Sequence, residues 1–274
     1  MLMTEHLNNG KVALRLVLPS DGALHEPTLS FMQACGLAVL RPSARRYTAH
    51  IPALPGMEVL FQRTADVTQR VEEGSAELGI TGLDRYLEFR SDERRVVSLI
   101  NDLGYGRCDL VLAVPESWLD ITSVDDLADL ALEFYQEGKQ LRIATKYRRL
   151  LRRHLFDRDI NLFTLVPVSG TVEAAPGAGY ADLIADLRDT GSTLRENRLK
   201  TLEGGTILAA QACLIGSPPL LAEAGEGRHL ARALMEMMEA HLRECGGADI
   251  AAAQVSYLFD GYSSAYHQLF DGHA

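Results

Sequence analysis

Residues 181–194 read Ala-Asp-Leu-Ile-Ala-Asp-Leu-Arg-Asp-Thr-Gly-Ser-Thr-Leu. The run from Ala181 to Leu187 is apolar apart from two aspartates, a pattern typical of a buried strand. The strand opens into a Thr-Gly-Ser-Thr loop at 190–193, where the glycine permits backbone conformations that other residues avoid. The stretch therefore predicts a strand that brings Asp186 and a polar loop to one edge of a sheet.

Strands, turns and helices alternate on both sides of this stretch. Short apolar runs predict further strands at residues 12–18, 59–61, 78–80, 110–114, 141–144, 163–168 and 207–215. Helical spacing and helix-start signals predict helices at residues 26–35, 65–74, 147–156 and after Ser123. This alternation implies an α/β protein with mostly parallel sheets.

The chain changes character after Pro218. Residues 228–245 are strongly amphipathic, and their methionines favour packing in a core or subunit interface over ligand binding. Residues 251–270 also have a helical pattern, which includes Tyr257, Phe259, Tyr262 and Tyr266. We expect a helical C-terminal tail that docks on the body of the protein or on a partner.

Composition limits the function classes. The chain has 274 residues, 47% of them hydrophobic, which is enough for a core in one large or two medium domains. Its formal net charge of −10 argues against nonspecific nucleic-acid binding, which needs an excess of Lys and Arg. The four cysteines form no C-x-x-C pair, which argues against a zinc site and favours reduced thiols. Because the sequence shows no signal peptide and no membrane span, we expect a soluble, cytoplasmic protein.

The loop at 190–193 has the chemistry of an oxyanion site. Sheets of α/β proteins bind ligands at the C-terminal ends of their strands, and here neighbouring N–H groups and three hydroxyls can converge on a phosphate. Arg188 and Arg195 are the nearby cations, so amide and helix-end dipoles would dominate. Asp186 can accept hydrogen bonds from the hydroxyls of a sugar that carries the phosphate. The alternative is an ordinary turn that caps a helix.

The longer context resembles the ATP phosphoribosyltransferase family, the first enzymes of histidine biosynthesis. The signature positions that match are Glu173, Gly179, Ala181, Ile184, Asp186, Thr190, Gly191, Thr193 and Leu194. Further segments match in the family's order, at residues 14–24, 63–66, 79–84, 103–115 and 142–147. The resemblance covers roughly residues 12–215.

The resemblance implies a two-lobed catalytic body of the type II periplasmic-binding-protein class, with the active site in the cleft. We assign residues 1–108 and 196–217 to lobe I, residues 109–195 to lobe II and residues 218–274 to a helical extension. The implied reaction joins N1 of ATP to C1 of the ribose of phosphoribosyl pyrophosphate, with inversion, loss of pyrophosphate and assistance from Mg²⁺. Displacement at an anomeric carbon depends on positioning and on stabilising the leaving group, and the sequence offers no Ser-His-Asp or Cys-His arrangement.

The resemblance also implies roles for individual residues. Glu173 and Asp186 would hold the ribose hydroxyls, and the 5-phosphate would be bound by Asp189, Thr190, Gly191, Ser192 and Thr193. Arg63 is the candidate for the pyrophosphate or the ATP phosphates, and it joins Asp186 as a candidate catalytic residue. Weaker candidates for ATP or pyrophosphate binding are Thr81, Gly82, Asp84, Tyr147 and Arg152.

Some of these roles have structural alternatives. Arg63 could be a solvated or salt-bridged surface arginine, and Asp84 could cap a helix. The ligands of Mg²⁺ are not identified; we expect the substrate phosphates to hold most of it. No histidine has metal-ligand spacing, and His50 and His154 are interpreted as surface or packing residues.

Two features depart from the family pattern. Many relatives carry a basic residue in the first turn, where this chain has Asp21, and a carboxylate cannot bind pyrophosphate directly. Asp21 could bind Mg²⁺ instead, or Arg63 and Lys146 could bind the pyrophosphate. The tail is too short for the histidine-sensing domain of long-form relatives, so we expect no histidine site of that kind. Short-form relatives depend on a subunit resembling histidyl-tRNA synthetase; whether this chain has such a regulatory partner stays open, and we expect a homo-oligomer, a dimer or larger.

Two other function classes compete with this one. A noncatalytic two-lobed small-molecule-binding protein would share the fold; Asp21 and the missing sensor domain favour it, whereas the intact run from Glu173 to Leu194 does not. A different phosphoribosyltransferase would show paired acids before its loop, but here Leu187 follows Asp186. Release of pyrophosphate that depends on ATP distinguishes these functions.

Overall fold

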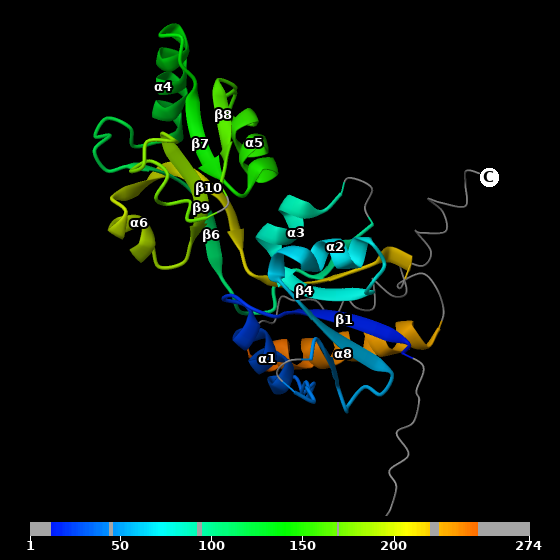
Figure 1. Cartoon of the computed structure of the whole chain (residues 1–274). Helices are drawn as coiled ribbons and strands as arrows, with labels where there is room; N and C mark the ends of the chain where they lie inside the picture. The colour runs from blue at the N-terminus through cyan, green and yellow to red at the C-terminus, as the bar shows by residue number, and fades with distance from the viewer. Residues whose placement is uncertain (1–11, 44–45, 92–94, 169, 220–224, 246–274) are drawn as a thin grey trace, which may run out of the picture. The chain divides into compact units, whose positions relative to one another are not determined.

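The structure is a computed structural model that describes residues 12–43, 46–91, 95–168, 170–219 and 225–245. The chain forms two compact units. The first comprises the chain up to Gly106 and from Gln211 onward, and the second runs from Arg107 to Ala210. Each unit has its own sheet, with helices packed against it (Figure 1).

The first unit contains a six-stranded sheet with the order β2-β3-β1-β4-β11-β5. Its strands are β1 (Leu14–Pro19), β2 (Thr48–His50), β3 (Met57–Gln62), β4 (Leu78–Gly82), β5 (Val97–Ile100) and β11 (Ala212–Gly216). β1 is parallel to β3 and β4, whereas β11 runs antiparallel between β4 and β5. The nearly continuous apolar sequence of β1 and β4 fits a sheet that is buried on both faces.

Helices cover both faces of this sheet. α1 (His25–Ala34) and α8 (Glu226–Glu244) pack on the face that carries Leu14, Leu16 and Leu18. On the opposite face, which carries Val17, lie α2 (Val67–Glu72), which follows the short 3₁₀ turn η1 (Thr64–Asp66), and α3 (Leu83–Phe89). Alternate residues of β1 therefore supply two separate hydrophobic clusters.

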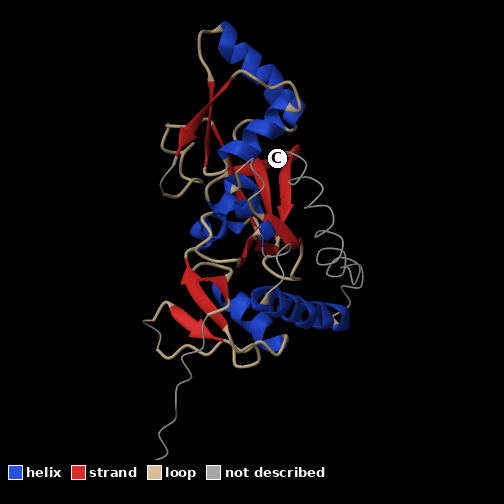
Figure 2. Ribbon diagram, turned by 90° about the vertical axis from the view of Figure 1, so that its right-hand side faces the viewer, coloured by secondary structure: helices blue, strands red, loops and turns tan. Residues whose placement is uncertain are grey.

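The C-terminal helix α8 belongs to the core of the first unit. It is the long blue helix in the lower half of Figure 2. Leu234, Met235 and Met238 are fully buried against β1 and its neighbours, which confirms that the methionines pack in a core. The second predicted helix of the tail, at 251–270, lies outside the described residues.

The second unit contains a five-stranded sheet with the order β10-β6-β9-β7-β8. Its strands are β6 (Cys108–Pro115), β7 (Leu141–Thr145), β8 (Phe163–Pro167), β9 (Leu183–Arg188) and β10 (Leu199–Ala210). β7 is parallel to β8 and β9, whereas β6 is antiparallel to β9 and β10.

The two faces of this second sheet are covered differently. α4 (Val124–Gln136) and α5 (Arg148–Phe156) pack on one face. The other face, here called the α6 face, carries Val111, Ala113, Ala144 and Ile184. It is covered by the non-helical segment 172–179 and the five-residue helix α6 (Ser192–Glu196).

α4 begins where the sequence predicts. Ser123 Oγ accepts a hydrogen bond from the N–H of Asp126 at 3.1 Å, and Asp126 Oδ2 accepts one from the N–H of Ser123 at 2.8 Å. This reciprocal capping box satisfies donors that a helix start leaves unpaired. Hydrogen bonds from the backbone of Thr122, and then of Ser123, lower the pKa of Asp126 to about 2.

The two sheets share one strand order. Each sheet contains three adjacent parallel strands, and the one that comes first in the chain lies between the other two. An antiparallel strand from elsewhere in the chain lies beside the last of the three. These four-strand sets are β3-β1-β4-β11 and β8-β7-β9-β6. The duplicated order is that of the type II periplasmic-binding-protein class, so the predicted α/β fold class is confirmed.

The structure divides the chain differently from the lobes assigned from sequence. The apolar run 207–215, predicted to be one strand, contains the end of β10 and most of β11, with a break at Gln211. Residues 196–210, assigned to lobe I, belong to the second unit because β10 pairs with β6. The earlier change of unit falls after Gly106, and α8 is part of a core rather than an extension.

The prediction of mostly parallel sheets is wrong. Of the nine strand pairs found in the described residues, four are parallel and five are antiparallel. The antiparallel pairs arise mainly because β6, β10 and β11 enter their sheets from distant parts of the chain. Such pairings leave no local signal in the sequence.

His154 on α5 is a packing residue, as predicted, whereas His50 is exposed. The Nδ1 atom of His154 lies 3.2 Å from Nη1 of Arg158, and Nε2 has no hydrogen-bond partner among the described residues. Burial first, and then the positive charge of Arg158, lower the pKa of His154 to about 4. The folded state therefore keeps this imidazole neutral.

We expect His154 to make the stability of the protein depend on pH. Its folded pKa of about 4 lies below the unfolded value of 6.5, so stability falls as the pH drops through this range. Urea unfolding should show wild type losing on the order of 2–3 kcal/mol relative to His154→Leu between about pH 7 and pH 4.5. His50→Leu, which replaces an exposed histidine, is the control: its free energy of unfolding should change with pH as that of wild type does. Parallel pH curves for wild type and His154→Leu would contradict the expectation.

Candidate active site

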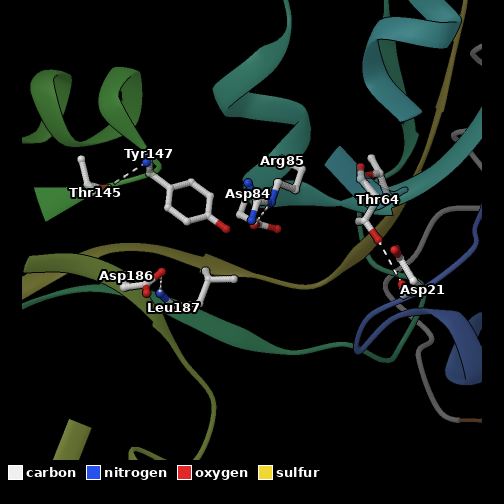
Figure 3. Close-up of polar contacts among 9 residues, drawn as sticks. Asp21, Thr64, Asp84, Arg85, Thr145, Tyr147, Asp186 and Leu187 are labelled. Atoms are coloured by element: carbon white, nitrogen blue, oxygen red, sulfur yellow. Dashed lines mark hydrogen bonds and ion pairs between the residues drawn. The ribbon is translucent and has the colours of Figure 1, made fainter. Parts of the chain in front are cut away.

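Two parallel strands of the first unit end side by side. β1 and β3 are paired in register up to Pro19 and Gln62, so the residues that follow them share one edge of the sheet. Asp21 and Arg63 lie just beyond these ends, and both are exposed. The main-chain oxygen of Asp21 accepts a hydrogen bond from Thr64 Oγ1 at 3.5 Å (Figure 3). Arg63 is therefore available to an anion at this edge.

The end of β4 contributes three more predicted residues to the same edge. Thr81 is fully buried, and its Oγ1 donates to the main-chain oxygen of Thr64 at 3.3 Å. Asp84 is buried, with Oδ2 3.6 Å from Nε of Arg85 (Figure 3). A Cβ atom on Gly82 would overlap the Asp84 carboxylate, so only glycine fits there without moving Asp84.

The structure does not support a capping role for Asp84. The N-cap of α3 is Gly82, no side chain makes a cap hydrogen bond there, and Asp84 lies within the first turn. Burying a carboxylate costs free energy, so a buried aspartate near a strand end indicates a compensating interaction or a function. Asp84 therefore remains a candidate for the site, together with the glycine that makes room for it.

In the second unit, β9 carries Asp186 near its C-terminal end. Asp186 and Ile184 point to the same face of the sheet, the α6 face, because side chains two residues apart in a strand are on one side. Ile184 is fully buried, whereas Asp186 is partly exposed. Asp186 Oδ1 accepts a hydrogen bond from the N–H of Leu187 at 2.9 Å (Figure 3).

Residues 189–191 connect β9 to α6, and the first two residues of α6, Ser192 and Thr193, complete the predicted 189–193 loop. Gly191 has φ of 76°, in the left-handed region that favours glycine. Thr190 Oγ1 lies 3.1 Å from Ser192 Oγ, and Arg195 Nη1 donates to the main-chain oxygen of Thr190 at 3.4 Å. α6 has five residues and so aligns few peptide dipoles. The loop offers hydroxyls and N–H groups to an anion, whereas α6 is too short to add much of the helix-end dipole that the sequence reasoning also expected.

A pocket of about 420 Å³ adjoins this loop. Its lining residues come from the loop, α6 and the strands beside it: Glu116, Arg188, Asp189, Thr190, Gly191, Leu194, Arg195, Leu199, Lys200 and Thr201. Three cations and two acids line it, and Arg188 is paired with Asp109 at 2.7 Å. The lining includes neither Asp186 nor Glu173, so this pocket is not the whole of the predicted ribose-phosphate site.

One hydrophobic cluster on the α6 face contains the sequence neighbours of the predicted ribose-phosphate residues. Segment 172–179 is anchored by Val172 and Ala175, both fully buried, and Glu173 lies partly exposed between them. The same cluster contains Ile184, two residues before Asp186, and Leu194, directly after the 189–193 loop. The packing thus brings Glu173, Asp186 and the loop onto one face of one sheet.

The family model of ATP phosphoribosyltransferase matches residues 63–240 of this chain. The chain belongs to the ATP phosphoribosyltransferase family. The ATP phosphoribosyltransferase of Brucella anthropi is 41% identical over 209 residues, which are 75% of this chain and 90% of the relative. That of Chelativorans sp. strain BNC1 is 40% identical over 207 residues, with 74% and 90% covered.

A solved structure shows the same fold. A chain of the ATP phosphoribosyl transferase (HisG:HisZ) complex from Thermotoga maritima has a TM-score of 0.64 at 24% identity, over 84% of this chain and 98% of that chain. The family match to ATP phosphoribosyltransferase extends to residue 240, well into α8. This agrees with the position of α8 in the core of the first unit.

Two of the weaker predicted residues lie at the start of α5 and on it. Tyr147 is fully buried at the start of α5, and its N–H donates to Thr145 Oγ1 at 2.9 Å (Figure 3). Arg152 is exposed on α5, and α5 packs on the face opposite the α6 face. A role of Tyr147 or Arg152 in binding ATP or pyrophosphate therefore stays a prediction.

Sequence reasoning named Lys146 only as an alternative residue for binding pyrophosphate, and it passed over the Arg142–Asp182 pair. Lys146 directly follows β7, which is parallel to β9 with Thr145 opposite Ala185, so Lys146 lies at the strand end next to Asp186. Arg142 and Asp182 pair with each other across 40 positions. A basic residue after an apolar strand was a usable signal for Lys146, but nothing local in the sequence identifies the Arg142–Asp182 pair.

The described residues offer no preformed metal cage. They contain no group of three or more His, Cys, Asp or Glu side chains that could hold an ion. Mg²⁺ commonly binds one or two carboxylates, several waters and the phosphates of a substrate, and the exposed Asp21 fits such a minimal site.

Among the helices of the described ranges, none combines the length and apolar character needed to cross a membrane.

We expect Gly191→Ala to weaken substrate binding more than it weakens the fold. A left-handed conformation costs a non-glycine residue about 1–2 kcal/mol, and the new Cβ would lie 3.4 Å from Arg195 Nη1. Steady-state kinetics should show a KM for phosphoribosyl pyrophosphate about tenfold higher. Gly138→Ala is the matched control, because Gly138 has φ of 75° with no atom within 4 Å of its Cβ position. Equal KM values in the two variants would contradict a binding role for the loop.

Proposed function

We propose that this chain is the catalytic subunit of an ATP phosphoribosyltransferase. It joins N1 of ATP to C1 of the ribose of phosphoribosyl pyrophosphate and releases pyrophosphate, the first step of histidine biosynthesis. Membership of the family supports this. The observation that carries the assignment to this chain is that Val172, Ile184 and Leu194, which are neighbours in sequence of Glu173, Asp186 and the 189–193 loop, pack in one cluster on the α6 face.

In this proposal the second unit binds the ribose 5-phosphate. Asp186 and Glu173 accept hydrogen bonds from the ribose hydroxyls, and charged acceptors make these bonds strong. Residues Asp189 to Thr193 bind the 5-phosphate through N–H groups and hydroxyls. Arg195 and Lys200, which line the adjoining pocket, add positive potential to the same region.

The first unit would bind the leaving group and ATP. Arg63 is exposed beside the ends of β1 and β3, and a guanidinium can hold two phosphate oxygens at once. Thr81, Gly82 and Asp84 line the neighbouring strand end, and Tyr147 and Arg152 of the second unit are weaker candidates for ATP. Mg²⁺, when bound with the phosphates, neutralises charge on the departing pyrophosphate. Asp21 is the residue of this chain that fits one of its ligand positions.

The chemistry needs positioning more than a protein nucleophile. Attack by N1 on C1 requires the two atoms to be in line with the departing oxygen, and binding both substrates rigidly supplies much of the rate. Positive charge grows on the ribose as pyrophosphate leaves, and a carboxylate held nearby, such as Asp186, stabilises that charge. Inversion at C1 follows from direct displacement by ATP.

Pyrophosphate release tests this function. Purified protein with phosphoribosyl pyrophosphate and Mg²⁺ should release pyrophosphate only when ATP is added, with product absorbance appearing at the same rate. Thr193→Ala should cripple this turnover. No product, even after a candidate regulatory subunit is added, would instead support the noncatalytic binding protein, and release with another nitrogen base but not ATP would indicate a different phosphoribosyltransferase.

We also propose an assembly and a location. The Thermotoga maritima structure is a HisG:HisZ complex, which supports a HisZ-like regulatory subunit for this chain, resembling histidyl-tRNA synthetase. A homo-oligomer, dimer or larger, and a cytoplasmic location complete the proposal; the four free thiols fit a reducing compartment. Light scattering of the chain alone and mixed with such a subunit, and cell fractionation, test these points.

A further inference from the structure

Arg142 and Asp182 make an unusually complete contact. Asp182 Oδ2 accepts hydrogen bonds from the N–H of Arg142 at 2.7 Å and from its Nε at 3.2 Å, and Oδ1 accepts one from Nη2 at 2.8 Å. The N–H of Asp182 donates to the main-chain oxygen of Arg142 at 2.8 Å. Arg142 lies on β7 and Asp182 directly precedes β9, so this bidentate ion pair fixes the start of β9 against β7.

The guanidinium also reaches the segment that carries Glu173. Arg142 Nη1 donates to the main-chain oxygen of Gly179 at 3.0 Å. Gly179 has φ of 76°, a left-handed conformation that other residues adopt only with strain. The glycine at position 179 therefore allows the chain to turn at the point where the Gly179 carbonyl accepts the hydrogen bond from Arg142.

Segment 172–179 is held at its two ends. Val172 and Ala175 are fully buried on the α6 face, and the C-terminal end is tied by the Gly179–Arg142 bond. Within the segment lie three short-range turns: Ala175 to Val172, Ala178 to Ala174 and Gly179 to Pro176, at 3.0 to 3.1 Å. Its remaining residues are partly or fully exposed. In the described part of the chain, the buried Val172 and Ala175 hold the half that carries Glu173, and the bond to Arg142 holds the C-terminal end.

We propose that Arg142 and Asp182 are a positioning pair for ribose binding: they hold segment 172–179 so that Glu173 points to the same substrate as Asp186. The inference rests on the ribose-binding role proposed above for Glu173. The Arg142 side chain is 42% exposed and that of Asp182 16%. A bidentate Arg–carboxylate pair of this geometry can stabilise the fold as well as position the segment, so the test below measures substrate binding and melting temperature side by side.

The test compares ribose 5-phosphate binding, by calorimetry, with kinetics in full-length variants. Arg142→Ala should weaken ribose 5-phosphate binding and raise the KM for phosphoribosyl pyrophosphate about tenfold, with the KM for ATP unchanged. Arg142→Lys should recover little of this, because an ammonium cannot hold the carboxylate and the Gly179 carbonyl together in a planar fork. Lys139→Ala is the matched control, since it breaks a 2.8 Å ion pair with Glu137 in the same unit and should change neither value.

A double variant separates positioning from a general structural effect. If Arg142 acts through Glu173, then Arg142→Ala should have no further effect on ribose 5-phosphate binding in a Glu173→Gln background. Fully additive losses, or a lowered melting temperature with ribose 5-phosphate affinity within twofold of wild type, would overturn the proposal. If Arg142→Ala does not fold, Asp182→Asn and Gly179→Ala are each expected to raise the KM for phosphoribosyl pyrophosphate selectively, and unchanged values in both would overturn it equally.

The outcome for Glu173→Gln distinguishes the two levels of inference. If Glu173→Gln binds ribose 5-phosphate as wild type does, the proposed function of the segment fails, whatever Arg142→Ala does. If Glu173→Gln weakens binding and Arg142→Ala does not, only the positioning pair fails.

Discussion

Replacing Asp186 with asparagine is expected to lower kcat/KM for phosphoribosyl pyrophosphate by about 10²–10³-fold. Asparagine keeps the shape of the side chain but removes the charge that strengthens its bonds to the ribose hydroxyls and stabilises positive charge near C1. Asp186 is partly exposed on β9, so the fold should tolerate the change. Steady-state kinetics with both substrates varied measure the effect.

The control for this variant is Asp129→Asn. Asp129 is exposed on α4, which packs on the face opposite the α6 face, so its charge is lost without touching the site. Asp129→Asn should retain wild-type kinetics. Equal rates for Asp186→Asn and Asp129→Asn would show that the carboxylate of Asp186 does not contact the substrate.

The second large effect is expected at Arg63. Arg63→Ala should lower kcat/KM by about 10²-fold, because a charge-assisted contact to phosphate oxygens is lost where negative charge grows during departure. It should also weaken product inhibition by pyrophosphate, which a substitution elsewhere would leave unchanged. This inhibition constant is the decisive measurement, since it reports on the leaving group directly.

Arg70→Ala provides the comparison for Arg63. Arg70 is an exposed arginine of α2, 3.8 Å from Glu73, in the same unit. Its removal should leave the pyrophosphate inhibition constant as it is in wild type. If Arg63→Ala behaves like Arg70→Ala, then Arg63 is a solvated surface residue, and binding of the leaving group depends on other cations such as Lys146.

Much of the fold could be predicted because it depends on local pattern. Apolar runs located β1, β3, β4, β6, β7, β8 and β9, and the capping box located the start of α4. The missed strands are short: β2 has three residues and β5 has four. The seven-residue helix α3 was also not predicted. The division at Gln211 was missed because the end of β10 and most of β11 form one apolar run. The partners of these strands, β6 and β4, are set by pairing far along the chain.

The candidate site was predictable where its residues are adjacent in sequence. Asp186 and the 189–193 loop follow one strand, so their chemistry could be read from spacing. The need for glycine at position 82 depends on the fold placing the Asp84 carboxylate in that space, and the Arg142–Asp182 pair depends on β7 meeting β9. Such tertiary contacts have no signature in a single sequence.

The division of one apolar run between two sheets also constrains how the protein folds during synthesis. A nascent chain that has reached Gly106 has β4 and β5 but not β11, the strand that separates them. The sheet of the second unit has an exposed edge at β6 until β10 emerges from the ribosome. The sheet of the second unit is complete at Ala210, whereas the first unit needs β11 and also α8, which ends at Glu244. We therefore expect the second unit to reach its native form first, and the first unit only late in translation.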